Sequence, residues 1–167
     1  PGFINFFMKP HWYVAQVEEM IKKGPDYGRS SYGKGEKVMV EFVSANPTGP
    51  MHMGNARGGA IGDVLAAALS WSGYDTTREF YVNDAGNQIE KFGKSLSARY
   101  RQLFLGEDAV EFPEDGYHGE DIRDHAKAYA EKHGDSLMAL PEEERKEALV
   151  AYALPKNIEA LKRDLHT

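Results

Sequence analysis

The stretch SANPTGPMHMGNARGG, residues 44–59, separates a run typical of a buried strand from a run typical of a long helix. The strand run, KVMVEFV at residues 37–43, is rich in β-branched and aromatic side chains. The helical run carries one apolar stripe, and Gly73 supplies a C-terminal stop. A strand that passes through a glycine- and proline-rich loop into a helix predicts the start of a β–α–β unit. The stripe comprises Met53, Ala56, Ala60, Ile61, Val64, Leu65, Ala68 and Leu69.

The segments that follow continue this alternation. TTREFYV at residues 76–82 predicts a second strand, and NDAG at residues 83–86 turns into a helix with an apolar face between Ile89 and Leu103. Strand, helix, strand and helix in this order predict an α/β fold with a parallel sheet and a right-handed crossover.

The flanking segments predict one edge strand and three further helices. The edge strand is expected at residues 2–8, and the helices at residues 12–21, at residues 121–133 and from Pro141 onward. The last helix contains Pro155, which predicts a break or a kink because proline lacks the backbone donor.

The composition is that of a globular chain of 167 residues, with 41% hydrophobic residues, a net charge of −6 and a pI near 5.5. This balance excludes a strongly basic nucleic-acid surface over the whole chain, although a local basic patch stays open. The lack of cysteine excludes thiolate chemistry, and no apolar run approaches 20 residues, so we expect no membrane span and a cytoplasmic location. Both ends interrupt regular patterns, which predicts a fragment of a longer protein.

GRSSYGKG, residues 28–35, nearly matches the phosphate-binding loop G-x-x-x-x-G-K-[ST]. Its last position is Gly35, so the hydroxyl that would hold magnesium is missing. It also precedes a predicted strand, whereas a phosphate loop follows a strand and opens a helix. We therefore expect that this stretch does not bind nucleotide phosphates.

The loop at residues 44–59 has the context for binding an anion. It connects the carboxyl end of a strand to a helix N-terminus, where unpaired N–H groups favour negative charge. His52 can donate a hydrogen bond to a phosphate, Gly54 lets a flat group approach the backbone, and Asn55 can also donate. The alternative is a helix that begins at a proline, with a surface histidine and with glycines that permit close packing.

Two longer stretches carry a family resemblance. VEFVSANPTGPMHMGNARGGAIGD (residues 40–63) and GYDTTREFYVNDAGNQI (residues 73–89) closely resemble the class I aminoacyl-tRNA synthetases, and within them arginyl-tRNA synthetase. The H-x-G-H signature of that class matches residues 52–55, with Asn55 in place of the second histidine. The resemblance implies an α/β fold with a partial Rossmann-like (HUP-type) parallel nucleotide-binding sheet and a helical insertion.

The resemblance also implies an activity. It is the ATP-dependent activation of L-arginine to arginyl-adenylate and transfer to tRNA(Arg), with Mg²⁺ accompanying ATP. His52, Gly54 and Asn55 would bind ATP, and His52 and Asn55 would act as the catalytic residues that stabilise charge on the phosphates. No DNA, membrane or protein-bound metal is implied.

Glu41 is a lone acid in an apolar strand, and a guanidinium group calls for a carboxylate. Without the resemblance, a solvent-facing carboxylate would be the simpler interpretation. The resemblance places Glu41 against the guanidinium of arginine, and Ser44 and Asn46 at its α-amino end. The roles of Asn83, Asp84 and Gln88 stay open.

The patterns and the resemblance together divide the chain into five segments. They are the end of an N-terminal domain (1–28), a linker (29–37), the first half of a catalytic domain (38–106), a mostly helical insertion (107–155) and the start of a return to the catalytic domain (156–167). The second signature of the family, Lys-Met-Ser-Lys-Ser, does not occur in these residues. We therefore expect the isolated chain to be inactive.

Two other functions stay open. A different nucleotidyltransferase with an H-x-G-H site would activate another carboxylate, and Glu41 would then not decide substrate choice. A non-enzymatic module that binds RNA or a partner would lose only stability when His52 is removed.

Overall fold

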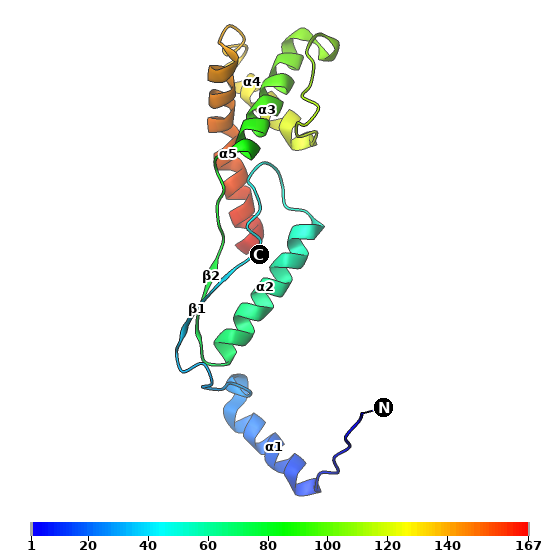
Figure 1. Cartoon of the computed structure of the whole chain (residues 1–167), viewed down its shortest axis with the longest axis vertical. Coiled ribbons are helices and arrows are strands. Elements are labelled where there is room, and N and C mark those ends of the chain that lie inside the picture. The colour runs from blue at the N-terminus through cyan, green and yellow to red at the C-terminus, as the bar shows by residue number, and fades with distance from the viewer. Residues whose placement is uncertain (1, 167) are drawn as a thin grey trace. The chain divides into compact units, whose positions relative to one another are not determined.

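The computed structural model describes residues 2–166, and within that range it contains five α-helices and two strands (Figure 1). In chain order these are α1 (Pro10–Lys23), β1 (Lys37–Glu41), α2 (Met53–Trp71), β2 (Asp75–Glu79), α3 (Asn87–Leu105), α4 (Glu120–His133) and α5 (Glu142–His166). Single 3-10 turns, η1 (Gly24–Asp26) and η2 (Glu107–Ala109), follow α1 and α3. All predicted helices and both central strands are present, but β1 ends before residue 43 and β2 before residue 82.

The two strands form a parallel sheet and are joined through α2. The N–H of Asp75 donates to the carbonyl of Glu36, and further along the N–H of Phe42 donates to the carbonyl of Glu79. Partner numbers rise together along both strands, which is the pattern of parallel pairing. The predicted β–α–β unit of an α/β fold is therefore confirmed.

The chain divides into two compact units, Pro1–Val40 with Asp63–Arg78 and Glu41–Gly62 with Glu79–Thr167. The division crosses β1, α2 and β2. The loop residues at the carboxyl end of β1 and the first turns of α2 belong to the second unit, together with α3, α4 and α5.

In the first unit, the backbone of residues 28–35 is bound to the turn that ends α2. The N–H of Gly33 donates to the carbonyl of Ser72 at 2.9 Å. The N–H of Gly35 donates to the carbonyl of Gly73 at 2.8 Å. These donors are used inside the protein, and the stretch leads into a strand, so it lacks the context of a phosphate loop, as the sequence predicts.

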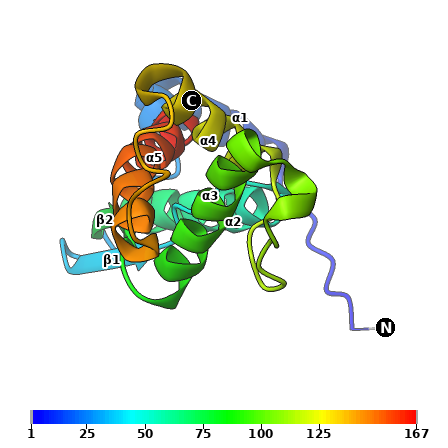
Figure 2. The same ribbon diagram turned by 90° about the horizontal axis from the view of Figure 1, so that it is seen from above.

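In the second unit, α3, α4 and α5 pack against one another as three neighbouring helices (Figures 1 and 2). Apolar residues at helical spacing on α3 face the other two helices, as amphipathic periodicity predicts. Phe92 and Tyr100 are fully buried there, and the hydroxyl of Tyr100 donates to the carbonyl of Gly134 at 2.8 Å. The core comprises Phe92, Leu96, Tyr100, Ile122, Ala126, Leu137, Leu149 and Ala153.

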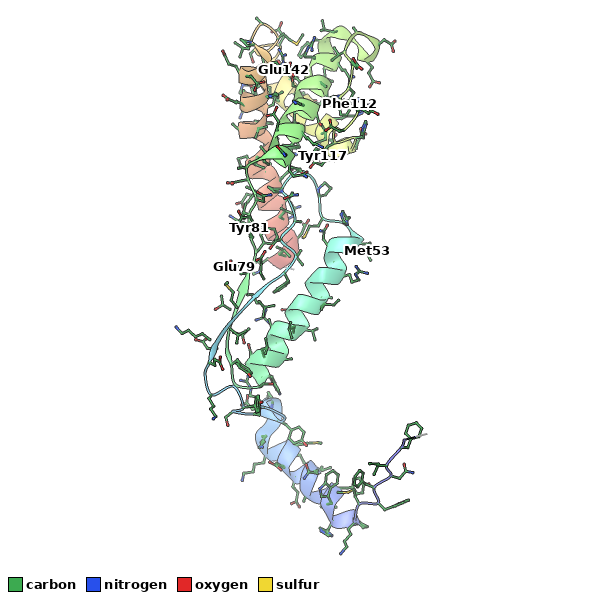
Figure 3. All side chains as sticks on the ribbon, viewed as in Figure 1. Met53, Glu79, Tyr81, Phe112, Tyr117 and Glu142 are labelled. Atoms are coloured by element: carbon green, nitrogen blue, oxygen red, sulfur yellow. The ribbon has the colours of Figure 1, made fainter. Side chains whose placement is uncertain are left out.

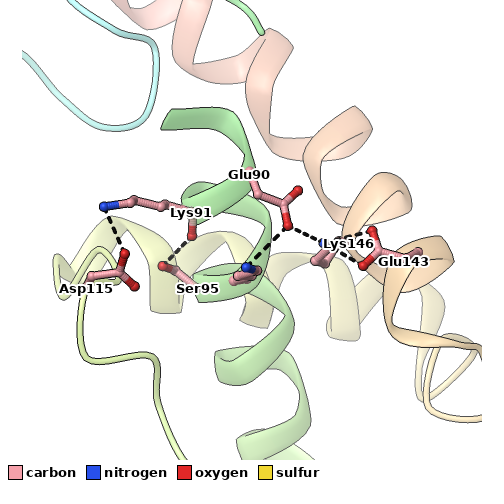
Figure 4. A network of polar contacts seen from close by, with 7 residues as sticks. Glu90, Lys91, Ser95, Asp115, Glu143 and Lys146 are labelled. Carbon is pink, nitrogen blue, oxygen red and sulfur yellow. Dashed lines mark hydrogen bonds and ion pairs between the residues drawn. The ribbon is translucent and has the colours of Figure 1, made fainter. Parts of the chain in front are cut away.

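A polar network borders this core (Figure 4). Lys146 is buried on α5, and its ammonium group pairs with Glu143 at 2.8 Å and with Glu90 on α3 at 2.5 Å. Burial opposes the charged form of Lys146, but the hydrogen bonds to Glu143 and Glu90 outweigh it and raise the pKa of the lysine. Lys91 pairs with Asp115 at 2.8 Å, which holds the loop before α4 against α3.

Three expectations about local structure are corrected. Residues 2–8 form no strand, since they pair with no other strand of the described chain, and Phe3 and Phe7 are exposed. Pro155 does not break α5, which runs through it to His166, so the first of the two alternatives, a break, is wrong, and a kink stays a prediction. The apolar stripe of α2 forms the expected helix but is not covered, because Ile61 is 64% exposed and Val64 is 67% exposed. None of the helices between residues 2 and 166 has the length and apolarity needed to cross a membrane.

Candidate functional site

The chain turns sharply just after β1. Val43 lies in the left-handed region with φ 57°, which is a strained conformation for a β-branched residue. The N–H of Ala45 donates to the carbonyl of Val43 at 2.6 Å, which closes a three-residue turn around Ser44. This strain marks the point where the strand ends and the loop begins.

Two glycines let the start of α2 lie directly against the end of β1. A Cβ on Gly62 would overlap the side chain of Phe42, and a Cβ on Gly59 would lie 3.0 Å from Val43. Larger residues would push the helix away from the strand. The close-packing interpretation of these glycines is therefore confirmed, and it fixes where the helix N-terminus lies.

His52 and Asn55 cap the N-terminus of α2 reciprocally. The N–H of Gly54 donates to Nδ1 of His52 at 3.1 Å. The N–H of His52 donates to Oδ1 of Asn55, also at 3.1 Å. This is a variant of the capping box, in which the side chain of Asn55 satisfies the N–H of His52, and the ring of His52 satisfies the N–H of Gly54, the second helical residue. Since Nδ1 of His52 accepts and Oδ1 of Asn55 accepts, the ring Nε2–H and the amide Nδ2 are the donors left for a ligand.

Gly54 makes room for the imidazole ring. A Cβ at this position would lie 3.0 Å from Cε1 and 3.1 Å from Nδ1 of His52. A larger residue would displace the ring from its hydrogen bond to the helix. The need to accommodate the His52 ring therefore explains a glycine at position 54. The close approach of a nucleotide to this glycine, which the sequence predicts, would be a second reason.

Ser44 and Asn46 are tied to the segment that follows β2. The N–H of Tyr81 donates to Oγ of Ser44 at 3.0 Å, and Nδ2 of Asn83 donates to Oδ1 of Asn46 at 3.0 Å. One oxygen of each side chain is thus already an acceptor. The hydroxyl hydrogen of Ser44 and Nδ2 of Asn46 are the donors that a ligand can use.

These loop residues line a cavity of about 480 Å³. The loop wall comprises Ser44, Ala45, Asn46, Thr48, Gly49, Pro50, His52 and Asn55. The facing wall comprises Tyr117 and Gly119, which precede α4, and Asp121 in its first turn. Figure 3 labels Tyr117. Ser44, Asn46, His52 and Asn55, all predicted from the sequence, therefore meet in one cavity. Residues 2–166 contain no cluster of three or more His, Cys, Asp or Glu side chains suited to a metal ion.

Glu41 and Gly54 do not line this cavity. Glu41 is the last residue of β1, and its side chain is exposed. Gly54 lies beside the His52 ring, as described above. The contact of Glu41 with a guanidinium and that of Gly54 with adenosine stay predictions.

The sequence pattern did not point to Tyr117 and Asp121. Their stretch, FPEDGYHGEDI, belongs to the segment 107–155, for which the sequence predicts a mostly helical insertion and no site residue. The N–H of Tyr117 donates to Oγ of Ser95 at 2.8 Å, and its hydroxyl bonds to Oε1 of Gln88, so α3 holds this wall in place. The one sequence signal that could have identified Tyr117 is its place between two glycines, Gly116 and Gly119, in an acidic segment.

A buried amide anchors the loop wall to the helices. Asn157 on α5 is 8% exposed, and its Nδ2 donates to the carbonyl of Pro47 at 3.0 Å. Its Oδ1 lies 2.7 Å from Nε2 of His125 on α4. Because Oδ1 can only accept, His125 carries its proton on Nε2. Two helices near the end of the chain therefore fix a backbone group of the cavity loop.

Asn157→Asp is expected to loosen this anchor without changing the size of the side chain. Aspartate keeps an acceptor for His125, but it places an oxygen where the carbonyl of Pro47 needs a donor, at a cost of about 1–3 kcal/mol. Amide hydrogen exchange of residues 44–55 in the full-length protein should become faster. Asn87→Asp, the same change at an exposed position of α3, is the control. Equal exchange in the two variants would contradict the anchor.

Residues 16–153 match the family described as tRNA synthetases class I (R), catalytic domain. The match covers well over half of the chain, and the chain belongs to this family. The resemblance predicted from residues 40–63 and 73–89 is therefore confirmed.

Relatives named arginine–tRNA ligase carry the similarity over nearly the whole chain. The protein of Acetivibrio thermocellus is 64% identical over 165 residues, which are 99% of this chain and 29% of that protein. The protein of Ruminiclostridium cellulolyticum is 57% identical over 167 residues, or 100% of this chain and 30% of that protein. The chain thus spans less than a third of the length of these relatives.

A solved structure agrees with this assignment. The structure provisionally named arginyl-tRNA synthetase from Campylobacter jejuni matches with a TM-score of 0.78 and 34% sequence identity. The match covers 95% of this chain and 34% of that one. A partial class I synthetase catalytic fold is therefore supported by both sequence and structure.

Proposed function

We propose that the full-length protein carrying this chain is an arginine–tRNA ligase, which activates L-arginine with ATP and transfers it to tRNA(Arg). The family membership supports the class, and the high identity to proteins named arginine–tRNA ligase supports the amino acid. The observation that carries the proposal is the capping box of His52 and Asn55, whose free donors and helix N-terminus border the cavity.

In the first step, the carboxylate of arginine attacks the α-phosphate of ATP in line, and pyrophosphate leaves. His52 would donate from Nε2 and Asn55 from Nδ2 to phosphate oxygens that gain charge as the bond breaks. The N-terminus of α2 adds the positive end of the helix dipole. Mg²⁺ would enter as part of the substrate, bound mainly to the phosphates of ATP. In the second step, a ribose hydroxyl at the tRNA 3′ end attacks the adenylate carbonyl, and AMP leaves.

Glu41 is the proposed partner of the guanidinium. Glu41→Gln in the full-length protein should raise the KM for arginine by about 10- to 100-fold, because a charge-assisted hydrogen bond is lost. The KM for ATP should stay unchanged. Glu79→Gln, at the last residue of β2, is the matched control. An unchanged KM for arginine in Glu41→Gln would favour a nucleotidyltransferase that activates another carboxylate.

The function is tested by arginine-dependent exchange between ATP and pyrophosphate in the full-length protein, with and without tRNA. Exchange with arginine but not with lysine or glutamate is the expected result. Exchange driven by a different carboxylate, or none under any condition, would overturn the proposal. A cytoplasmic location and the division into segments 1–28, 29–37, 38–106, 107–155 and 156–167 belong to the same proposal.

A further inference from the structure

One carboxylate lines the cavity within the part of the chain that the structure describes, and it belongs to Asp121 in the first turn of α4. The residue is half-buried, and its Oδ2 is enclosed without a hydrogen-bond partner in residues 2–166. A Cβ on Gly49 of the facing loop would lie 3.4 Å from this oxygen, so the carboxylate lies against the loop. A carboxylate oxygen that lacks both water and a donor has unused capacity to accept a proton.

The surroundings make this carboxylate more basic than an aspartate in water. Burial raises the pKa of Asp121, and hydrogen bonds from its own N–H and that of Ile122 only partly oppose this. On the same helix, His125 lowers the pKa and Asp124 raises it. The facing loop at residues 44–50 contains no charged side chain. The other titratable groups around Asp121 are Asp124, His125, His52 and Tyr117.

None of the other polar side chains that line the described cavity wall can serve as a base. Nδ1 of His52 accepts the N–H of Gly54 at 3.1 Å, so the ring carries its proton on Nε2 and has no free lone pair. Hydroxyl and amide side chains bind a proton too weakly to remove one from a substrate near neutral pH. Asp121 is therefore the side chain of this wall that can act as a base. The hydroxyl and amide residues of the wall are Ser44, Asn46, Thr48, Asn55 and Tyr117.

The two steps of the proposed reaction differ in their need for a base. In the first step the nucleophile is the carboxylate of arginine, which has no proton to lose. In the second step a ribose hydroxyl attacks, and its proton must leave as the ester bond forms. A side chain that takes such a proton in the transition state accelerates the reaction by roughly 100- to 10,000-fold.

We propose that Asp121 accepts the proton of the ribose hydroxyl at the tRNA 3′ end when this hydroxyl attacks the arginyl-adenylate. This inference rests on the proposed function and gives the segment predicted as an insertion a part in the second step. The hydroxyl oxygen forms the ester bond to the carbonyl carbon, and the bond between that carbon and the phosphate oxygen breaks. AMP leaves with the bonding electron pair, and the proton passes to Asp121 and then to water.

The test is Asp121→Asn in the full-length protein, with Asp124→Asn as the matched control, since Asp124 is exposed on the same helix and does not line the cavity. Asparagine keeps the size of the side chain and still accepts a hydrogen bond, but it cannot take the proton. In single-turnover experiments with saturating tRNA, Asp121→Asn should form arginyl-tRNA about 100-fold more slowly than wild type. Pyrophosphate exchange in the presence of tRNA, which reports the first step, and the Kd for tRNA should stay unchanged.

Two results would contradict this role. A fall in pyrophosphate exchange as large as the fall in transfer would place Asp121 in the first step and overturn the inference. An unchanged rate of transfer would also overturn it, and would leave the phosphate of the adenylate as the base.

The pH dependence of transfer supplies a second readout. A base works only when it is ionised, so transfer by the wild type should slow as the pH falls through the raised pKa of Asp121. The other titratable groups are the same in both proteins, so Asp121→Asn should lack this part of the profile. Equal profiles in single turnover between pH 5 and pH 8 would overturn the inference.

These results separate the inference from the proposed function. If wild type does not exchange pyrophosphate with arginine, the proposed function fails. If it does, and Asp121→Asn transfers arginine at the rate of the wild type, only the role of Asp121 fails.

Discussion

Replacing His52 by alanine in the full-length protein should lower kcat for arginine-dependent pyrophosphate exchange by about 100- to 1,000-fold. The ring Nε2 is the donor that His52 has left, because Nδ1 accepts from the N–H of Gly54 at 3.1 Å. A donor fixed before the reaction stabilises charge that grows in the transition state, so its loss should affect kcat more than the KM for ATP. Steady-state exchange kinetics measure both constants.

The alanine variant also loses the cap of α2, which costs about 1 kcal/mol of helix stability. His52→Asn separates the two effects, since asparagine is a good N-cap but its amide does not reach as far as Nε2. We expect this variant to recover the stability of the wild type and to keep the loss of kcat. If His52→Asn restores kcat as well, then His52 acts as a cap alone, as a non-catalytic binding module would require.

Replacing Phe92 by alanine should destabilise the bundle of α3, α4 and α5 by about 3–5 kcal/mol. Phe92 is fully buried in the core, and its ring lies 6.5 Å from that of Tyr117 in an edge-on arrangement. The substitution therefore opens a cavity in the core and removes support from the wall that carries Tyr117. Amide hydrogen exchange of α3 and α5 in the full-length protein measures the local loss of stability.

Leu103→Ala is the control for Phe92. Leu103 lies on the same helix and is 49% exposed, so its truncation should change exchange in α3 and α5 only slightly. The KM for arginine should rise in Phe92→Ala and not in Leu103→Ala, because only the former disturbs the cavity wall. Equal protection of the bundle in both variants would show that Phe92 does not support the core.

Local composition and periodicity predicted the helices and the two central strands, because both depend on residues that are neighbours in the sequence. The β-branched and aromatic composition of residues 37–43 and the helical stripe that begins at Met53 are local patterns, and the parallel pairing of β1 and β2 follows from the β–α–β order. Periodicity failed where the outcome depended on distant partners. Residues 2–8 found no strand to pair with in the described chain, and the stripe of α2 is exposed at Ile61 and Val64.

The sequence predicted only that part of the candidate site whose residues lie close together along the chain. Ser44, Asn46, His52 and Asn55 lie in one loop of twelve residues, so a single motif and its family resemblance identify them together. Glu41 belongs to the same family stretch, residues 40–63, yet it ends β1 with an exposed side chain outside the cavity. The motif gives residue types and spacing, but not the direction in which each side chain points.

By itself, the sequence determined the α/β pattern, the family and the loop that carries the signature residues. Only the tertiary structure decided that Tyr117 and Asp121 form the opposite wall, and that Asn157 holds the carbonyl of Pro47 from 110 residues away. It also showed that Asn55, in place of the second signature histidine, completes the cap of α2. The physical reason is that local propensities reach a few residues along the chain, whereas a cavity wall and a buried hydrogen bond form only after distant segments have packed.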